Sequence, residues 1–420
     1  MDRRRFLQTF GASGVTGTAF LAGCTGDENG AVGNGNGNGN GNGNGNGNGN
    51  GNDEQVDEIE LVKASGSSPE STIVQNVIIP FFERLEEESD GRITVDAHWG
   101  GSLGGTIETH DMVREGSIDM LATLTHYFDI WEQHNAPNMP MIMDEGIEED
   151  SPDLVSGTDY MIAHNIECMP GGFLYEDFHK YDVHMGSNIQ NSTMQLFTTE
   201  EVGAVTELSD WEGLTLSNTT PFQAQMIPEL GAAAETVDFT EWYTSMDRGV
   251  IDGALDPGGV IEGYGVYDVA TYASSNYPLD RYHNPHALNL DTYESMSPEL
   301  QAIWDEVSWS FSIESMYWNL SYAEEMYSDM VDAGLEMYEV PEGTIEQVEE
   351  IIEPLIEDYL RDLGAWESYQ RFVDLTEHVA QERAGDFDPE TVEEQVSLAP
   401  DDHPVSEWWD TYEPQTDLLT

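Results

Sequence analysis

Basic residues are scarce in this 420-residue chain, which has 13 Lys and Arg against 82 Asp and Glu and a formal net charge of −69. Nucleic-acid binding depends on clustered Lys and Arg that displace counterions from phosphates, so this deficit excludes nucleic acid as a partner. It also excludes electrostatic adhesion to an anionic membrane surface. The acidic residues are spread along the chain, and only Lys63 and Lys180 are lysines. Because molar salt shortens the Debye length to about 3 Å, we expect a protein that works in concentrated brine.

Cysteine is also scarce. The chain has only Cys24 and Cys168, so no intramolecular disulfide forms if Cys24 serves as an anchor. We then expect Cys168 to be a small buried apolar residue rather than a nucleophile. The sequence lacks a G-x-S-x-G nucleophile elbow, an H-E-x-x-H pair and a Walker loop. These absences favour a protein that is not an enzyme, although chance carboxylate pairs keep a secreted hydrolase as the main alternative.

Residues 1–24 have the layout of an export signal. The segment D-R-R-R-F-L-Q at 2–8 precedes an apolar stretch at about 15–22 that is too short to be a stable membrane span. Paired arginines followed by Phe-Leu resemble the twin-arginine signal, which directs export of folded proteins. The segment L-A-G-C at 21–24 resembles the lipobox of bacterial and archaeal lipoproteins. This resemblance implies that Cys24 is lipidated and becomes the first residue of the mature chain.

Residues 25–57 read as a flexible tether. Ten uninterrupted Gly-Asn repeats occupy 33–52 and offer no apolar side chain to offset the cost of ordering the backbone. A flexible segment of this length has a root-mean-square span of roughly 25 Å. We therefore expect a folded body held just outside the membrane by its lipid anchor.

The folded body alternates predicted strands with predicted helices. Strands are expected at 59–64, 93–97 and 118–123, with a helix at 73–89 kinked by Pro80 and a shorter helix at 107–115. This order predicts an α/β fold with a largely parallel sheet and ligand loops at the carboxyl ends of its strands.

Three segments carry a family resemblance. Residues 83–121 contain S-D-G-R, G-S-L-G and G-S-I-D-M in that order. Residues 208–257 contain D-W-E-G-L-T-L-S, L-G-A, E-W-Y-T-S-M, G-V-I-D-G and a polar residue before proline. Residues 295–307 read S-M-S-P-E-L-Q-A-I-W-D-E-V. Together they resemble the solute-binding proteins of tripartite ATP-independent periplasmic (TRAP) transporters, the DctP-like family.

The resemblance implies a two-lobed periplasmic-binding-protein-like fold, a Venus flytrap with hinge strands and a long helix that spans both lobes. The solute-binding domain would cover 58–385, with lobe I at about 58–188 and 281–320 and lobe II at about 189–280 and 321–385. Residues 386–420 form an acidic C-terminal extension beyond the resemblance, and we expect it to be partly disordered. Trp304, Trp309, Phe311, Met316 and Trp318 fall on the long helix and are expected in the core.

The resemblance also locates a departure in the ligand site. Such proteins usually hold a substrate carboxylate with an arginine at the end of the G-L-x-(I/L)-R strand, and Ser217 stands there. The preceding strand offers only Gln195, and Asp256 occupies the polar position before Pro257. Burying a carboxylate without a partner costs several kcal/mol. Asp256 therefore needs a cation, a hydroxyl-rich ligand or solvent, unless it is simply a solvated turn residue.

Three kinds of ligand follow from this departure and remain open. One is a neutral polyol, sugar or nucleoside-like compound whose hydroxyls donate to Asp256 and Ser217. Another is an organic acid bridged by a Ca²⁺ or Na⁺ ion on Asp256, which would be the only metal ligand we name and the only cofactor expected. The third is an organic acid held by a different base, namely Lys63, Lys180 or Arg281.

The candidate ligand-binding residues lie in loops after predicted strands or match family contact positions: Ser67, Ser68, Thr125, His126, Tyr127, Ser217, Asn218, Phe222, Tyr243 and Asp256. The sequence thus predicts an extracytoplasmic lipoprotein on the outer face of the membrane that delivers a small solute to integral membrane permease subunits. A ligand-sensing surface receptor with the same fold is a further alternative.

Overall fold

The computed structural model describes residues 55–104, 106–122, 132–140, 158–237, 239–277, 279–383 and 387–419. Contacts divide the chain after Glu54, and residues 55–420 form one unit. The predicted signal, Cys24 and nearly all of the predicted tether lie outside the described residues. Within the described residues, no helix combines the length and the apolar composition that crossing a membrane requires.

Eleven strands form two mixed sheets in the described residues. Their bounds are β1 (Ile59–Ala64), β2 (Ile93–His98), β3 (Met120–Ala122), β4 (Val183–Thr193), β5 (Gln195–Thr199), β6 (Thr215–Ser217), β7 (Ala233–Glu235), β8 (Gly253–Asp256), β9 (Ala270–Ser274), β10 (Arg281–Asn289) and β11 (Glu336–Tyr338). The first sheet has the order β2-β1-β3-β10-β4, and the second has the order β11-β9-β5-β8-β6-β7.

The helices cover these sheets and connect them. Their bounds are α2 (Ile79–Glu88), α3 (Thr106–Arg114), α4 (Asn135–Asn138), α5 (Thr158–Glu167), α6 (Phe173–Lys180), α7 (Pro221–Glu229), α8 (Phe239–Asp247), α9 (Gly258–Gly263), α10 (Leu290–Ser295), α11 (Pro298–Ala333), α12 (Glu342–Leu363), α13 (Trp366–Glu382), α14 (Val392–Val396) and α15 (Pro404–Trp409). Short π- and 3₁₀-helical turns are η1 (Val74–Ile78), η3 (Leu208–Trp211) and η4 (Val266–Asp268).

The first sheet has the predicted parallel order at its amino-terminal part. β1 pairs in parallel with β2 and β3, while β10 runs antiparallel to β3 and β4. The predicted kink at Pro80 takes the form of a π-helical turn just before α2, in which the Ile79 amide bonds to the Val74 carbonyl. Proline has no N–H to donate back along the helix, so the hydrogen-bond pattern shifts at this point.

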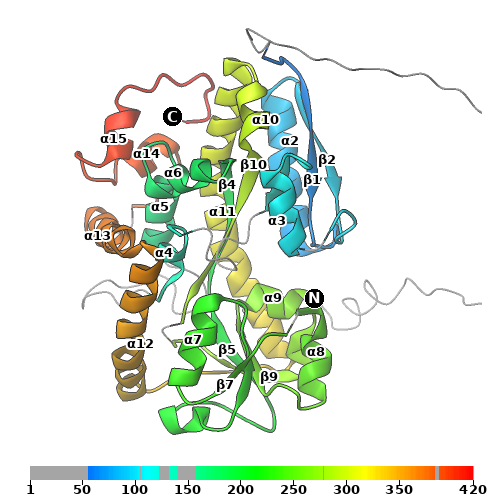
Figure 1. Ribbon diagram of the computed structural model, residues 1–420, viewed down its shortest axis with the longest axis vertical. Helices are drawn as coiled ribbons and strands as arrows, with labels where there is room; N and C mark the ends of the chain where they lie inside the picture. The colour runs from blue at the N-terminus through cyan, green and yellow to red at the C-terminus, as the bar shows by residue number, and fades with distance from the viewer. Residues whose placement is uncertain are drawn as a thin grey trace, which may run out of the picture. The chain divides into compact units, whose positions relative to one another are not determined.

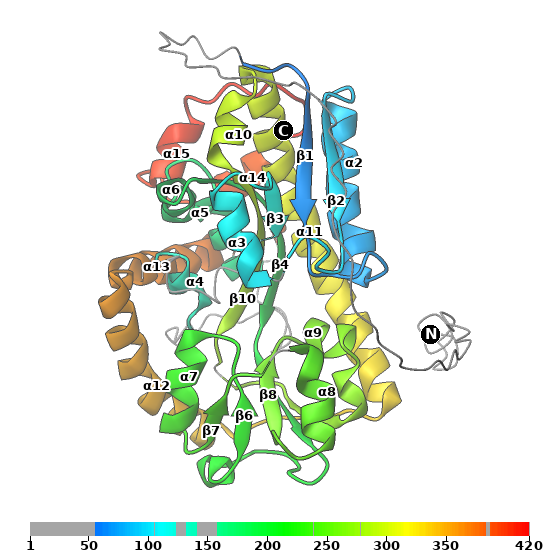
Figure 2. The ribbon, with the colours of Figure 1, turned by 45° about the vertical axis from the view of Figure 1, so that its right-hand side comes forward.

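Three elements run from the first sheet to the second. β4 continues into β5, β10 pairs with β4 along its length, and α11 lies beside both (Figures 1 and 2). Trp304 of α11 packs into the core under the first sheet, and Met330 of α11 packs into the core under the second. The predicted long helix that spans both lobes is therefore confirmed. We call the first sheet with its helices the first lobe and the second sheet with its helices the second lobe.

The helices after α11 connect the lobes again. Ile352 of α12 packs against Leu216 and Phe222 of the second lobe. Gly364 then adopts a left-handed conformation that ends α12, and Phe372 of α13 packs against Tyr160 of α5. The last helix of the segment expected in lobe II thus contacts α5, which lies in the segment expected in lobe I.

The C-terminal extension is ordered in the structure, so the expectation of partial disorder is wrong for residues 387–419. Thr391 and Glu394 form a capping box that begins α14. Val392, Val396 and Val405 are buried in one cluster with residues of α5, α11 and α13. These apolar residues are few and lie in short helices, so an acidic composition concealed them in the sequence.

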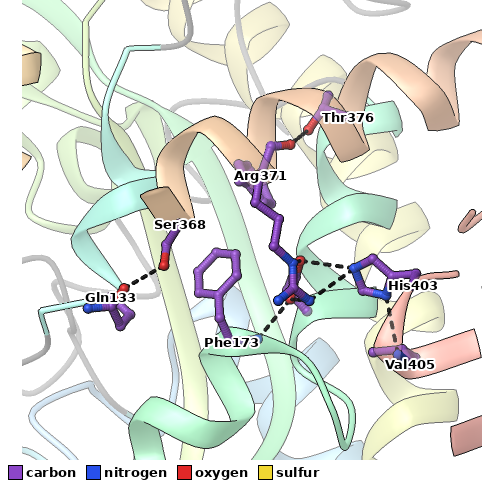
Figure 3. A network of polar contacts seen from close by, with 9 residues as sticks. Gln133, Phe173, Ser368, Arg371, Thr376, His403 and Val405 are labelled. Carbon is purple, nitrogen blue, oxygen red and sulfur yellow. Dashed lines mark hydrogen bonds and ion pairs between the residues drawn. The ribbon is translucent and has the colours of Figure 1, made fainter. Parts of the chain in front are cut away.

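A buried carboxylate holds this extension to the body. Glu167 at the end of α5 is fully buried and lies 3.0 Å from the Arg371 guanidinium and 3.1 Å from Nε2 of His403. It also accepts the Phe173 N–H at 2.8 Å. Figure 3 shows Arg371 reaching from α13 toward His403, which caps α15. The carboxylate of Glu167 therefore connects three segments that are distant in the sequence, namely α5, α13 and the C-terminal extension.

Replacing Arg371 with Met should destabilise the protein, because Glu167 would stay buried with its charge poorly compensated. We expect a loss of roughly 2–3 kcal/mol in the free energy of unfolding, below the value for a fully buried pair because the Arg371 side chain is 36% exposed. Urea titration at constant high salt, followed by tryptophan fluorescence, measures this change. The matched control is Arg361→Met, whose exposed i,i+4 pair with Glu357 should contribute at most about 0.5 kcal/mol. Equal effects of the two substitutions would show that Arg371 does not stabilise the fold by compensating the buried charge of Glu167.

Candidate functional site

A cavity of about 460 Å³ lies where residues of both lobes meet. The loop after β1, the helical turn that follows it and the end of β3 supply one wall. α9 and the middle of α11 supply the other (Figure 2). Its lining residues are Ala64, Ser65, Gly66, Ser67, Ser68, Pro69, Ser71, Thr72, Ile73, Ile78, Gly100, Thr109, Leu121, Ala122, Gly259, Val260, Glu262, Gly263, Tyr264, Asn284, Trp318 and Tyr322.

The loop after β1 is fixed by its own hydrogen bonds and by the turn after β2. The Ser67 carbonyl accepts the Gly100 N–H at 3.0 Å, and the Ser65 carbonyl accepts the Gly101 N–H at 3.0 Å. Gly100 and Gly101 both have positive φ, which non-glycine residues adopt only with strain. Ser67 and Ser68, both predicted site residues, line the cavity from this loop.

The opposite wall is aromatic and acidic. Trp318 and Tyr322 stack with ring centroids 4.7 Å apart and an interplanar angle of 14°. The Tyr322 hydroxyl donates to Oε2 of Glu262 at 3.0 Å. Burial raises the pKa of Glu262, the Tyr322 hydrogen bond opposes this, and the nearby charge of Asp329 raises it further. A half-buried carboxylate with two aromatic neighbours therefore faces the cavity.

α9 approaches α11 closely at Gly258. A Cβ atom at this position would overlap the Tyr327 hydroxyl, so only glycine fits. The same hydroxyl donates to Oε1 of Gln195 on β5. This close approach places Glu262 of α9 beside Tyr322 of α11.

Gln195, Ser217 and Asp256 are the residues at which the sequence departs from the family pattern. They lie at one end of three neighbouring strands of the second sheet. Gln195 of β5 pairs with Asp256 of β8, and Ser217 of β6 pairs with Ala254 of β8. All of these side chains are buried. In the described part of the chain, neither the Ser217 hydroxyl nor either oxygen of Asp256 has a hydrogen-bond partner. Burial raises the pKa of Asp256 well above its usual value, and neighbouring Thr219 lowers it by a smaller amount.

Asp280 lies near this group and raises the pKa of Asp256 further through its charge. Its own carboxylate is buried and accepts hydrogen bonds from Thr220 Oγ1 at 3.0 Å and Gln223 Nε2 at 3.0 Å. Burial raises the pKa of Asp280 to about 6, against the lowering effect of Gln223 and Thr220. Two buried carboxyl groups with raised pKa values, Asp256 and Asp280, therefore lie near each other.

The other predicted site residues lie elsewhere. Phe222 is 1% exposed and packs in the core with its ring centroid 5.5 Å from that of Tyr359. Tyr243 is 44% exposed on α8, and Asn218 lies beside Thr236 at the end of β6. None of these residues lines the cavity, and the predicted contacts Ser217 and Asp256 do not line it either. The predicted contacts Thr125, His126 and Tyr127 lie outside the described residues.

The three alternative bases occupy different environments. Lys180 is exposed and forms an ion pair with Glu132. Arg281 is buried on β10, with its guanidinium 4.4 Å from the centre of the Tyr160 ring. Lys63 is fully buried, has no hydrogen-bond partner for its ammonium group within the part of the chain that the structure describes, and lies 5.8 Å from the Phe82 ring. Burial lowers the pKa of Lys63 to about 7.

Sequence reasoning missed the acidic and aromatic wall of the cavity. Trp318 was expected in the core; it packs partly buried against the first-lobe core and also lines the cavity with Tyr322, four residues further along the same helix. That i,i+4 spacing of two aromatic residues was the available signal. Glu262 gave none, because it is one of 82 acidic residues. Among the described residues, no group of three or more His, Cys, Asp or Glu is arranged to hold a metal ion.

Comparison with known proteins agrees with this architecture. The family described as bacterial extracellular solute-binding protein, family 7 (DctP), matches residues 64–362. A solute-binding protein of Sulfitobacter sp. strain NAS-14.1 is 24% identical over 301 residues, which cover 68% of this chain and 82% of that protein.

Solved structures show the same fold. A TRAP periplasmic solute-binding protein of Roseobacter denitrificans, crystallised with β-D-glucuronate, has a TM-score of 0.65 at 15% identity and covers 75% of this chain and 99% of its own. A marine metagenome TRAP protein specific for aromatic acid ligands has a TM-score of 0.63 at 17% identity over 78% and 100%. DctP6 of Bordetella pertussis, which binds pyroglutamic acid, has a TM-score of 0.64 at 15% identity over 76% and 99%.

The raised pKa of Asp280 predicts a specific pH dependence of stability. A carboxyl whose pKa is higher in the folded state stabilises the fold below its unfolded pKa of 3.8, and this stabilisation is lost as the pH rises through about 6. Asp280→Asn removes the titration. The free energy of unfolding of the variant minus that of the wild type should therefore rise by about 2.4 kcal/mol between pH 4 and pH 8.

Urea titrations across this pH range at constant salt measure how this difference changes with pH. A destabilisation that the amide causes equally at every pH does not affect that change. Asp374→Asn on the exposed face of α13 is the control and should give a flat difference. A flat difference for Asp280→Asn as well would show that the carboxylate is solvated.

Proposed function

Because this chain belongs to family 7 of the bacterial extracellular solute-binding proteins, the DctP family, we propose that it captures a small solute between its two lobes and delivers it to a TRAP-type permease. The observation that carries this proposal is the cavity of about 460 Å³ to which both lobes contribute. Its size is that of a pocket for a small organic molecule. Its walls come from strand ends of the first lobe and from α9 and α11, so an occupant contacts both lobes at once.

Capture follows from this arrangement. A solute that touches the loop after β1 and also α9 is bound most tightly when the two walls are close together. β4, β10 and α11 are the elements that run between the lobes, and they are the natural hinge for such closure. A closed, loaded state differs in surface from an open one, which gives a permease a basis for recognising it.

We propose a polar hydroxylated or otherwise non-acidic solute as the first candidate. Ser217 and Asp256, which are buried and do not line the cavity, offer acceptors and a donor in the region where the resemblance implies an arginine. An organic acid is the second candidate, favoured by the buried Arg281 on hinge strand β10. It would need that base, Lys63, or a cation on Asp256 to balance its charge.

The export signal, the anchor and the working conditions are part of the same proposal. We propose that a twin-arginine signal exports the folded protein, that Cys24 carries a lipid and that residues 25–57 tether the body outside the membrane. The excess of acidic residues supports a halophilic protein. Binding rather than catalysis is the expected activity, and turnover of a bound solute would contradict it.

Calorimetry with a solute panel at molar salt tests binding. The panel contains uronates, aromatic acids, pyroglutamate, polyols and ammonium compounds, and we expect one class to bind. Ser67→Trp fills the cavity and should weaken that binding at least tenfold, while Ser102→Trp on the exposed turn after β2 should not change it. Failure of every class to bind, or equal affinity of both variants for the bound class, would contradict the proposed site.

Fractionation of cells tests the anchor. Cys24→Ser should release the protein from membranes into the medium, because the lipidated thiol is absent. Cys168→Ser changes a buried cysteine and should leave the protein on the membrane. A Cys24→Ser protein that still sediments with membranes would overturn the lipid anchor.

A further inference from the structure

The wall of the cavity formed by α9 and α11 has the chemistry of a cation site. Glu262 lines the cavity, and its carboxylate accepts the Tyr322 hydroxyl at 3.0 Å. Trp318 and Tyr322 line the same wall as a stacked pair, 4.7 Å between ring centroids. Tyr264, just beyond α9, adds a third aromatic ring to the lining. Aromatic faces attract organic cations, most strongly when a carboxylate is also near.

Among the described residues that line the cavity, none carries a positive charge opposite Glu262. The described residues that line it include no Lys, Arg or His. The charge of Asp329, on α11, also raises the pKa of Glu262. Asp256, at the end of β8, is a further buried carboxylate without a hydrogen-bond partner among the described residues, but it does not line the cavity. Glu262 is therefore the only formally charged side chain in the described lining of the cavity.

We propose that the cavity binds a solute bearing a poorly hydrated organic cation, such as a quaternary ammonium group, with Glu262 opposite the charge and Trp318 and Tyr322 as the aromatic wall. This inference rests on the proposed function, since it names the solute class of the same cavity. Glu262 supplies the negative charge, and the faces of the two rings supply an apolar surface that attracts a cation. The serine-rich loop after β1 supplies hydrogen bonds to the remainder of the solute.

The ring pair also explains how a carboxylate retains selectivity in brine. At molar salt an exposed carboxylate is surrounded by Na⁺, and long-range attraction is screened within about 3 Å. A small inorganic ion keeps its water and gains little from an aromatic face. A methylated ammonium group is weakly hydrated, so contact with the rings favours it over Na⁺. Selectivity then depends on short contacts that salt does not remove.

Calorimetry at constant molar NaCl with choline and 3,3-dimethylbutan-1-ol tests the proposal. The two compounds have the same shape, and only choline is charged. We expect choline to bind at least tenfold more tightly than the alcohol in the wild-type protein. Glu262→Gln should remove this difference by weakening choline at least tenfold, and Trp318→Leu should weaken choline as well. Glu353→Gln on the exposed face of α12 is the control and should leave both affinities unchanged.

The outcomes are distinguishable. Equal binding of choline and the alcohol to the wild-type protein, a comparison that requires no variant, overturns the cation assignment. Binding of uronates or aromatic acids without binding of choline also overturns it, but leaves solute capture standing. Failure of every member of the solute panel to bind overturns the proposed function together with this inference. Unchanged choline affinity in Glu262→Gln, with native circular dichroism, excludes Glu262 as the group that faces the charge.

Discussion

The antiparallel pairing of β4 with β10 is the constraint on which the rest of the structure depends. It extends from the Val183–Asn289 pair in the first lobe to the Thr193–Arg281 pair next to the second. Because β4 continues directly into β5, this ladder fixes where the second sheet begins relative to the first. α11 lies along the ladder and contributes to the cores of both lobes. The cavity between the loop after β1 and α9 exists because these crossing elements bring two otherwise independent cores to a shared boundary.

Scarcity of positive charge is the second constraint. Some buried carboxylates are paired with an arginine, and others have no basic partner among the described residues. Arg371 neutralises the buried Glu167, and Arg383 pairs with Asp159 and Asp388, so two of the few basic residues hold the C-terminal extension to α5 and α13. Asp256 and Asp280 receive no such partner among the described residues and titrate at higher pH instead. A buried pair that loses one member is costly. The distribution of arginines therefore indicates where rigidity is needed and where a ligand can supply the missing charge or hydrogen bonds.

Local sequence patterns predicted the architecture but only part of the site. β1 and β2 follow from alternating apolar residues, whereas the long helix α11 was expected from the family resemblance of residues 295–307. Ser67 and Ser68 were predictable because loops after parallel strands point into the cleft. Phe222 and Tyr243 were chosen by family position, and one lies in the core while the other is exposed. Glu262 was not predictable, since its role depends on the close packing of Gly258 against Tyr327 rather than on any pattern along the chain. The C-terminal helices were missed because a handful of valines is enough to bury them.

The proposed work in concentrated brine restricts what such a site can use for recognition. A protein with a net charge of −69 attracts cations of every kind, so charge alone distinguishes nothing in brine. Discrimination must come from contacts that act within a few ångström and depend on how strongly a solute holds its water. A carboxylate next to two stacked rings meets this requirement, because the rings favour the cation that loses its hydration most easily.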